Sequence, residues 1–258
     1  MKERVLITGA SSGIGLELAR LAAAEGCDLV LVARSADRLE QLATELRQSH
    51  SVEVTVLPSD LTRPEAPGEL VAELEKRQLP VDILVNNAGF ATYGPFAETD
   101  RRAELDMLQL NMVALTDLTK LLLPPMIARG HGRVMNVAST AAFQPGPLMA
   151  VYYATKAYVL SLSEALANEL KDQGVSVTAF CPGPTESGFQ AAAGMQKSRL
   201  VQRKLPTSAE VARVGWAATR RGQAVCVPGT MNWIYATAIR FLPRSLVTSL
   251  VRKAQAPS

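Results

Sequence analysis

The stretch VLITGASSGIGLELAR, residues 5–20, decides the fold. An apolar run typical of a strand leads into a glycine-rich turn, and apolar residues at helical spacing follow that turn. Gly9, Gly13 and Gly15 allow the backbone to turn tightly and approach a pyrophosphate, and the next helix offers its free N–H groups. A glycine cluster alone would fit any tight connection. Its place between the first strand and the first helix predicts a nucleotide-binding turn.

The same alternation of short apolar runs and longer helical patterns continues along the chain. Further strands are expected at residues 27–33, 52–57, 81–86, 133–138, 175–180 and 224–227, and helices at 15–25, 36–48, 64–77, 100–129 and 152–171. Runs such as DILVNN have the continuous apolar character of strands that are buried on both faces. The sequence therefore predicts an α/β fold, a single Rossmann-type doubly wound parallel sheet of about seven strands with helices on both faces.

One domain, residues 1–258, is the simplest organisation, because no linker, repeat or low-complexity tract interrupts the pattern. Within it, we expect residues 185–213 to form a substrate lid and residues 230–258 to form an amphipathic C-terminal extension. The long helix at 100–129 should bend or end near Pro124 and Pro125.

Composition and charge exclude several classes of protein. Apolar residues make up 48% and charged residues 20% of the 258 residues, which is typical of a globular domain. The net charge of +3 comes without a Lys/Arg block, so no nucleic-acid partner is expected. Three cysteines without a C-x-x-C pair, and only two histidines, argue against a metal site, a disulfide framework and a Ser-His-Asp triad. Neither a signal peptide nor a membrane-spanning helix is expected, and we predict a reducing, cytoplasmic location.

The glycine spacing G-x3-G-x-G departs from the G-x-G-x-x-G of the common dinucleotide fingerprint. TGASSGIG resembles instead the turn of the short-chain dehydrogenase/reductase family. Further landmarks of that family follow in the expected order, and they are NNAG at 86–89, Ser139, Tyr152, Lys156, Pro182 and Gly183. The resemblance spans residues 8–187 and implies hydride transfer between a nicotinamide cofactor and a substrate carbonyl or alcohol.

Arg34 decides the expected cofactor. An NAD site usually carries an acidic residue at the end of the second strand, where this chain has Ala33 followed by Arg34. Because a guanidinium matches a phosphate, we predict NADP(H), with Arg38 as a second candidate whose alternative is a solvated helix charge. The resemblance implies that Asp60, with Leu61 beside it, binds the adenine amino group. The alternative for Asp60 is an N-cap of the next helix.

The remaining cofactor contacts are implied by the resemblance. They are Gly9, Ser11, Ser12, Gly13, Ile14 and Gly15 of the turn, Asn86, Ala88 and Gly89 of NNAG, Tyr152 and Lys156, and Pro182, Gly183, Thr185 and Ser187 of the loop after the sixth strand. Asn86 is expected to contact the cofactor and Asn87 to be structural. The family pattern P-G-x3-T ends here in Ser187, so the hydroxyl that meets the carboxamide is either Ser187 or Thr185.

Tyr152 and Lys156 are four residues apart and share a helix face. A lysine charge at ~4 Å contributes ~4 kcal/mol at an effective dielectric of ~20, which would bring a phenol of pKa ~10 into range as a general acid or base. Ser139, thirteen residues earlier, is expected to hydrogen-bond the substrate carbonyl. The resemblance implies that Asn111 binds backbone and a water that relays protons to the lysine, and a helix kink is the alternative. Tyr153 lies three residues from Lys156, but the spacing from Ser139 favours Tyr152.

An apolar pocket is expected beside these groups, lined by Phe143 and Phe189 together with Ser139 and Tyr152. It would take a small apolar ketone, aldehyde or alcohol. Further candidates for its wall, with ordinary packing as the alternative, are Tyr93, Leu148, Met149 and Met195.

The basic, amphipathic C-terminal extension has two interpretations, contact with an anionic membrane surface or a lid or subunit-contact helix. The resemblance implies a homodimer or homotetramer paired through the helices at 100–123 and 152–171. The main functional hypothesis is an NADP(H)-dependent reductase or dehydrogenase. A non-catalytic NADP-binding regulator on the same fold is the first alternative, and an epimerase or dehydratase of the nucleotide-sugar branch is the second.

Overall fold

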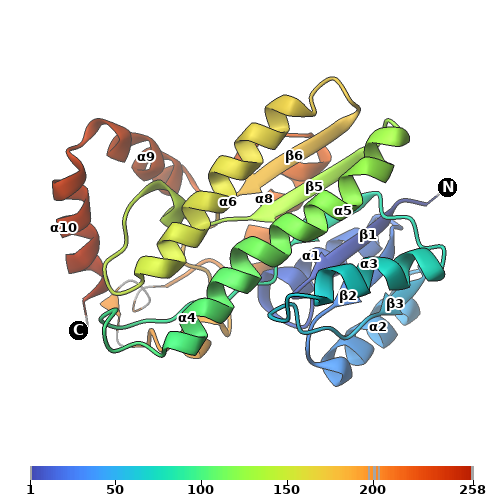
Figure 1. Cartoon of the computed structure of the whole chain (residues 1–258), viewed down its shortest axis with the longest axis horizontal. Coiled ribbons are helices and arrows are strands. Elements are labelled where there is room, and N and C mark those ends of the chain that lie inside the picture. The colour runs from blue at the N-terminus through green and yellow to red at the C-terminus, as the bar shows by residue number, and fades with distance from the viewer. Residues whose placement is uncertain (1, 197, 200–201, 203, 257–258) are drawn as a thin grey trace.

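Seven parallel strands form a single sheet in the computed structural model, which describes residues 2–196, 198–199, 202 and 204–256 (Figure 1). The strands are β1 (Arg4–Thr8), β2 (Asp28–Val32), β3 (Val54–Val56), β4 (Ile83–Asn86), β5 (Gly132–Val137), β6 (Val175–Phe180) and β7 (Val225–Cys226). Their order, β3-β2-β1-β4-β5-β6-β7, confirms the predicted doubly wound sheet. Because the order reverses between β1 and β4, a ligand crevice is expected beyond the carboxyl ends of these strands.

Helices cover both faces of the sheet, as predicted. One face carries α1 (Gly13–Ala24), α2 (Ala36–Ser49) and α8 (Ser208–Arg220), and the other carries α3 (Ala66–Lys76), α5 (Leu115–Ala128) and α6 (Ala150–Glu169). Successive side chains of a strand point to opposite faces. Val5 and Ile7 of β1 therefore join the core under α1, and Leu6 joins the core under α3 and α5. Burial on both faces explains why β1 lacks polar alternation.

The lid predicted at 185–213 ends earlier than expected, because its last residues begin a helix that covers the sheet. Thr207 and Glu210 form a capping box, which starts α8 at Ser208. A β-bridge joins Glu186 to Thr207. The segment predicted as a lid contains the short helix α7 (Phe189–Ala192), and its residues 197, 200–201 and 203 lie outside the described part of the chain.

The long helical region consists of α4 (Arg101–Leu108), the π-helical turn η1 (Gln109–Ala114) and α5. The helix does not end at Pro124 and Pro125, because α5 runs through both prolines to Ala128. The two carbonyls that lose a donor to these prolines belong to Lys120 and Leu121, whose side chains are exposed, so water can replace the missing bonds. The irregular turn lies at η1 instead, and it contains Asn111.

Among the described residues, one helix is long and apolar enough to cross a membrane. This is the continuous stretch Arg101–Ala128, with a mean hydropathy of 1.2 over its qualifying window. Leu118, Leu122 and Met126 pack it against the sheet. We therefore interpret it as a sheet-covering helix.

The predicted C-terminal extension folds into α9 (Thr230–Ala238), η4 (Ile239–Phe241) and α10 (Arg244–Gln255), which lie together at one end of the molecule (Figure 1). Val247 and Val251 of α10 share an apolar cluster with Tyr153 of α6. The Tyr93 hydroxyl, in the loop after β4, donates to the carbonyl of Gln255. The last helix is thus held against the same end of the molecule as the carboxyl ends of the strands.

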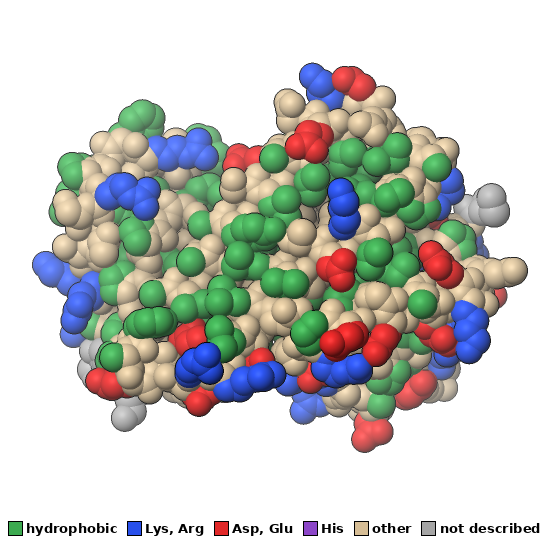
Figure 2. Space-filling model, in the orientation of Figure 1, with side chains coloured by type: hydrophobic (Ala, Val, Ile, Leu, Met, Phe, Trp, Pro, Cys, Tyr) green, Lys and Arg blue, Asp and Glu red, His purple; other side chains and the backbone are tan. Residues whose placement is uncertain are grey.

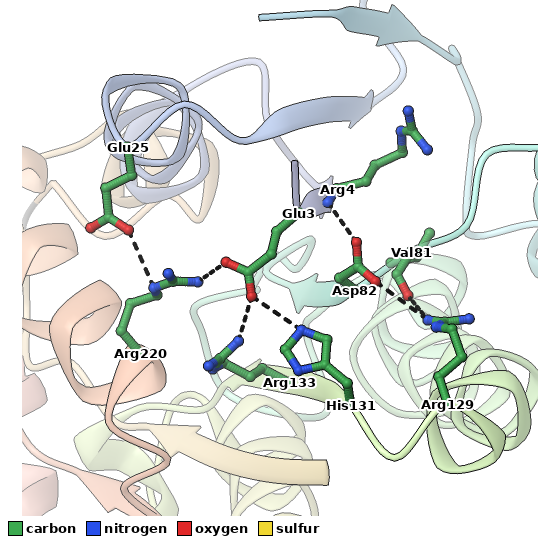
Figure 3. Close-up of polar contacts among 9 residues, drawn as sticks. All are labelled: Glu3, Arg4, Glu25, Val81, Asp82, Arg129, His131, Arg133 and Arg220. Carbon is green, nitrogen blue, oxygen red and sulfur yellow. Dashed lines mark hydrogen bonds and ion pairs between the residues drawn. The ribbon is translucent and has the colours of Figure 1, made fainter. Parts of the chain in front are cut away.

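A charged cluster ties the amino end of the sheet together (Figure 3). Glu3, just before β1, accepts from Arg133 of β5 at 2.7 Å and from Arg220 of α8, and it lies 3.2 Å from Nε2 of His131. Burial would raise the pKa of the Glu3 carboxyl, but the hydrogen bond and charge of Arg220, with those of Arg133, outweigh it. The pKa therefore lies below its usual 4.5.

We expect Glu3→Gln to lower the free energy of unfolding by about 1 kcal/mol at neutral pH, because it removes the charge that two arginines share. A carboxyl whose pKa is lowered by folding stabilises the fold above its unfolded pKa, and this contribution is lost as pH falls through the folded pKa. In urea titrations, the gap between wild type and variant should therefore shrink below pH 4.5. Glu53→Gln is the control, because the Glu53 side chain is 81% exposed. Equal losses from both substitutions at neutral pH would contradict the role of Glu3.

Candidate active site

A cavity of about 580 Å³ lies beyond the carboxyl ends of the strands. It brings together most of the residues predicted from the sequence. Those that line it are Gly9, Ser11, Ser12, Gly13, Ile14, Arg34, Asp60, Leu61, Ala88, Gly89, Ser139, Tyr152, Lys156, Pro182, Gly183, Thr185, Ser187 and Phe189. Six residues predicted for the site lie outside its lining, namely Gly15, Asn86, Tyr93, Asn111, Phe143 and Leu148.

The glycine-rich turn forms one wall of the cavity. Gly9 and Gly13 have φ values of +66° and +57°, which favour glycine over other residues. A Cβ at Gly9 would also lie 2.8 Å from Nδ2 of Asn87, so the turn and NNAG can approach this closely only with glycine. Ser12 is the N-cap of α1, but its side chain caps no helical N–H. The first N–H groups of α1 are thus left for a ligand.

Gly15 serves packing rather than the cavity itself. A Cβ there would lie 2.4 Å from the Gly9 carbonyl oxygen and 2.4 Å from Nδ2 of Asn87. Gly15 thus allows a close approach between α1 and the turn, and its predicted cofactor contact stays a prediction.

Asn87 faces the cavity and Asn86 faces the core, which is the reverse of the expected placement. Asn87 lines the cavity, although its Nδ2 also donates to the Thr8 carbonyl at 2.9 Å. Asn86 is buried under α5, where its Nδ2 donates to Thr119 and Asn136, both at 2.9 Å. The reason is strand alternation: residue 86 points to the same face as Leu84, whose side chain belongs to the core under α3 and α5.

Thr8 joins the ends of β1 and β4. Its Oγ1 accepts from the backbone N–H groups of Asn87 and Ala88, both at 3.0 Å, and donates to the Val85 carbonyl at 3.3 Å. NNAG is therefore held in place against the turn by a hydroxyl from the neighbouring strand.

Arg34 and Arg38 line the cavity beyond the end of β2, and both are exposed. Within the described residues, neither guanidinium has an ion-pair partner, so both are available to an anionic ligand. Asp60 lines the same part of the cavity and accepts from the hydroxyl of Thr62 at 2.8 Å. It is not the N-cap of α3, because that position is occupied by Glu65.

Tyr152 and Lys156 lie on α6, and Ser139 follows β5 as the N-cap of the short helix η2 (Thr140–Phe143). Nζ of Lys156 donates to the Val137 carbonyl at 2.7 Å and lies 5.7 Å from the centroid of the Tyr152 ring. The Ser139 hydroxyl donates to the Pro182 carbonyl at 3.4 Å. Three elements thus bring a hydroxyl, a phenol and an amine to one end of the cavity.

Burial acts against the predicted effect of the lysine on the phenol, and that effect stays a prediction. Burial raises the pKa of Tyr152 to about 12, and a hydrogen bond with Ser139 opposes that rise only in part. Burial also lowers the pKa of Lys156 to about 8, against a smaller opposing effect of Cys181. Removal from water is the largest cause of both pKa shifts. The phenol therefore keeps its proton at neutral pH.

Asn111 braces the site from behind. Its Oδ1 accepts from the N–H of Phe90 at 3.2 Å, and its Nδ2 donates to the Phe90 carbonyl at 3.1 Å and to the Thr155 hydroxyl at 3.2 Å. The backbone contact implied by the resemblance is therefore present, and Asn111 also lies in the π-helical turn η1. The water relay to the lysine stays a prediction.

Tyr153 lines the apolar part of the cavity, and its ring makes an edge contact with Tyr152 at a centroid distance of 6.1 Å. It packs so tightly on Gly146 that a Cβ there would lie 2.2 Å from the ring. Ser139 lowers the pKa of Tyr152 but not that of Tyr153, and the choice of Tyr152 stays a prediction.

The apolar wall differs in part from the predicted one. Phe143 lies outside the lining and packs against the apolar cluster that includes Leu115 and Val159. Phe90 lines the cavity although the sequence analysis did not identify it, and its position directly after NNAG was the available signal. Phe189, Met149 and Met195 line the cavity as expected.

Comparison with known proteins agrees with this geometry. Residues 3–198 match the family described as short chain dehydrogenase. A putative ketoacyl reductase of Streptomyces coelicolor is 38% identical over 73% of each chain. The ketoacyl reductase HetN of Nostoc sp. is 35% identical over 69% of this chain, and the match spans only 62% of HetN. A very-long-chain 3-oxoacyl-CoA reductase of Anas platyrhynchos is 31% identical over 96% of this chain and 78% of its own.

The likeness extends to solved structures. A short-chain dehydrogenase from Sphingobium yanoikuyae in complex with NADPH is 35% identical, has a TM-score of 0.85 and covers 99% of both chains. The bulky-bulky ketone specific alcohol dehydrogenase from Comamonas testosteroni is 30% identical, with a TM-score of 0.79 and coverage of 98% of this chain and 96% of its own. The family match covers most of the chain, and the protein belongs to the short-chain dehydrogenase family.

Proposed function

We propose that the protein is an NADP(H)-dependent oxidoreductase that reduces the carbonyl of an apolar ketone or aldehyde, or oxidises the corresponding alcohol. One observation carries the proposal: Arg34 lines the same cavity as Ser139, Tyr152 and Lys156. Arg34 follows β2 and Ser139 follows β5, three strands apart in the sheet, which is roughly 14 Å at the usual strand spacing. An extended dinucleotide spans such a distance.

The residues present fit a dinucleotide with a phosphate on its adenosine ribose. The free N–H groups of α1 and the glycine turn suit the pyrophosphate, and Arg34 and Arg38 suit the extra phosphate. The NADPH complex of the Sphingobium yanoikuyae relative supports this assignment. When bound, the nicotinamide supplies or accepts the hydride.

The chain's own residues handle the proton. Because burial holds the pKa of Tyr152 at about 12, its phenol is protonated at neutral pH and can donate to the carbonyl oxygen of a ketone. The hydroxyl of Ser139 can bond the same oxygen and hold it near the phenol. Lys156, with a pKa of about 8, is largely charged at neutral pH and stabilises the phenolate that remains after the proton has left.

The substrate is an apolar carbonyl compound, because the part of the cavity beside Tyr152 has apolar walls. These walls come from Phe90, Met149, Tyr153, Phe189 and Met195. The names of the ketoacyl and 3-oxoacyl-CoA reductases among the relatives support 3-oxoacyl thioesters as the first compounds to test.

The test is to follow NADPH oxidation with purified protein and a panel of 3-oxoacyl thioesters, aryl ketones, steroid ketones and aliphatic aldehydes. We expect turnover of at least one apolar carbonyl and a preference for NADPH over NADH. NADPH binding without turnover of any compound, in either direction, would instead support the non-catalytic regulator. Consumption of NADH in preference to NADPH would contradict the cofactor assignment.

The homodimer or homotetramer implied by the family resemblance stays a prediction. The helices expected to pair subunits expose Leu105, Val113 and Leu121 on α4, η1 and α5. Light scattering of the purified protein decides between the two assemblies.

A further inference from the structure

We propose that the segment made of α9, η4 and α10 docks the protein on an anionic lipid bilayer through its outward apolar face. This face, here called the C-terminal patch, consists of Met231, Trp233, Ile234, Tyr235, Phe241, Leu242, Leu246 and Leu250. All eight side chains are exposed, and Phe241 is 84% exposed. So many large apolar residues on one short segment exceed the scattered apolar residues of an ordinary surface.

The segment is anchored by its other face. Val247 and Val251 of α10 are buried against Tyr153, and the carbonyl of Gln255 accepts from the Tyr93 hydroxyl. Leu246 and Leu250 are one helical turn apart, so they form a stripe beside the buried one. The exposure of the patch is therefore a property of a packed helix rather than of an unattached tail.

The positive charge of the segment favours an anionic partner. Residues 230–258 carry Arg240, Arg244, Arg252 and Lys253 but no aspartate or glutamate. Basic side chains beside apolar ones are the pattern that binds the surface of a bilayer containing anionic lipids. Figure 2 shows hydrophobic and basic side chains next to each other over this end of the molecule.

A second copy of the chain fits the patch less well. A symmetric contact would place two segments that each carry these four cations against one another, because a two-fold interface uses the same patch of both subunits. Such like-charge contacts oppose association, whereas anionic headgroups would neutralise the four cations. The exposed Trp233 and Tyr235 also suit the boundary between headgroups and acyl chains, where an amphipathic ring can keep its polar atom hydrated.

Docking in this orientation would place the apolar side of the active-site cavity next to the bilayer. Phe189 and Tyr152, which line the cavity, pack against the same apolar cluster that holds Val247 and Val251 of α10. The docking proposal does not depend on the proposed reaction, and its test uses binding alone.

The experiment is flotation of the purified full chain with phosphatidylcholine vesicles, with and without phosphatidylserine. We expect binding to the anionic vesicles, weak binding to the neutral ones, and release by high salt. Phe241→Asp should lower the partition coefficient at least about tenfold, because a large apolar side chain is replaced by an anion. Arg240→Glu combined with Arg244→Glu should weaken binding to anionic vesicles only.

Controls separate the patch from general effects. Phe96→Asp removes another exposed phenylalanine, in the loop after β4, and Arg101→Glu reverses a cation outside the patch. Both should bind vesicles like the wild type. Circular dichroism verifies the fold of each variant, and Trp233→Ser provides a second patch variant if Phe241→Asp fails to fold.

Three results would overturn the proposal. They are equal binding to neutral and anionic vesicles, binding that survives Phe241→Asp and Trp233→Ser, and absence of vesicle binding in the wild type. If the wild type does not bind vesicles and the patch variants have a lower molar mass in light scattering, the C-terminal patch is a subunit interface.

Discussion

Tyr152→Phe should lower kcat for carbonyl reduction about 10³-fold, because it removes the proton donor and leaves the ring in place. NADPH affinity, measured by fluorescence titration, should change little. The reason is that burial keeps the Tyr152 phenol protonated at neutral pH, in the cavity that Ser139 and Lys156 also line. Loss of a single oxygen atom should therefore abolish proton transfer without disturbing the cavity.

Tyr153→Phe is the matched control for this result. Tyr153 is the next residue, is buried beside Tyr152 and lines the same cavity. Its substitution should leave kcat close to that of the wild type. If the two variants lost equal activity, or if only Tyr153→Phe were inactive, Tyr152 could not be the general acid.

Arg34→Ala should raise the KM for NADPH about 10- to 100-fold and leave kcat nearly unchanged. A charge-assisted hydrogen bond between guanidinium and phosphate contributes about 1.5–3 kcal/mol, and each 1.4 kcal/mol corresponds to roughly tenfold in binding. The KM for NADH should stay the same, because NADH lacks the phosphate. The variant should therefore lose much of its preference for NADPH.

Arg38→Ala distinguishes the two cations at this end of the cavity. Arg38 lines the cavity as Arg34 does, but it lies one turn further along, on α2. We expect a smaller rise in KM for NADPH than Arg34→Ala produces. A larger effect at Arg38 would assign the main phosphate contact to that residue, and unchanged KM values in both variants would contradict the phosphate assignment.

The residues that could be predicted from the sequence are those whose spacing carries the information. Tyr152 and Lys156 share a face as soon as their segment is a helix. The position of Arg34 follows from its place directly after the second strand. The seven strands could also be predicted, because strands that are buried on both faces appear in the sequence as continuous apolar runs.

The errors arose where one residue of register or tertiary burial decides the outcome. Asn86 and Asn87 are adjacent, and only the alternation of β4 shows which of them faces the core. The first residues of α8 were assigned to the predicted lid. The capping box at Thr207 and Glu210 marks the start of a helix, but it does not show that this helix packs on the sheet. The pKa of Tyr152 depends on how completely the fold removes water, which no spacing predicts.

The two sides of the cavity differ in how many amino-acid substitutions they can tolerate. The nucleotide side comes from the turns after β1, β2 and β4, which are constrained by the sheet itself, whereas the far wall comes from α7, Met195 and a cluster backed by α10. Substitutions in those late segments can reshape the pocket without touching the hydride-transfer machinery. In directed evolution toward a new substrate, we therefore expect mutations to accumulate at residues 189–195 and at the buried Val247 and Val251 of α10. These are the positions to randomise.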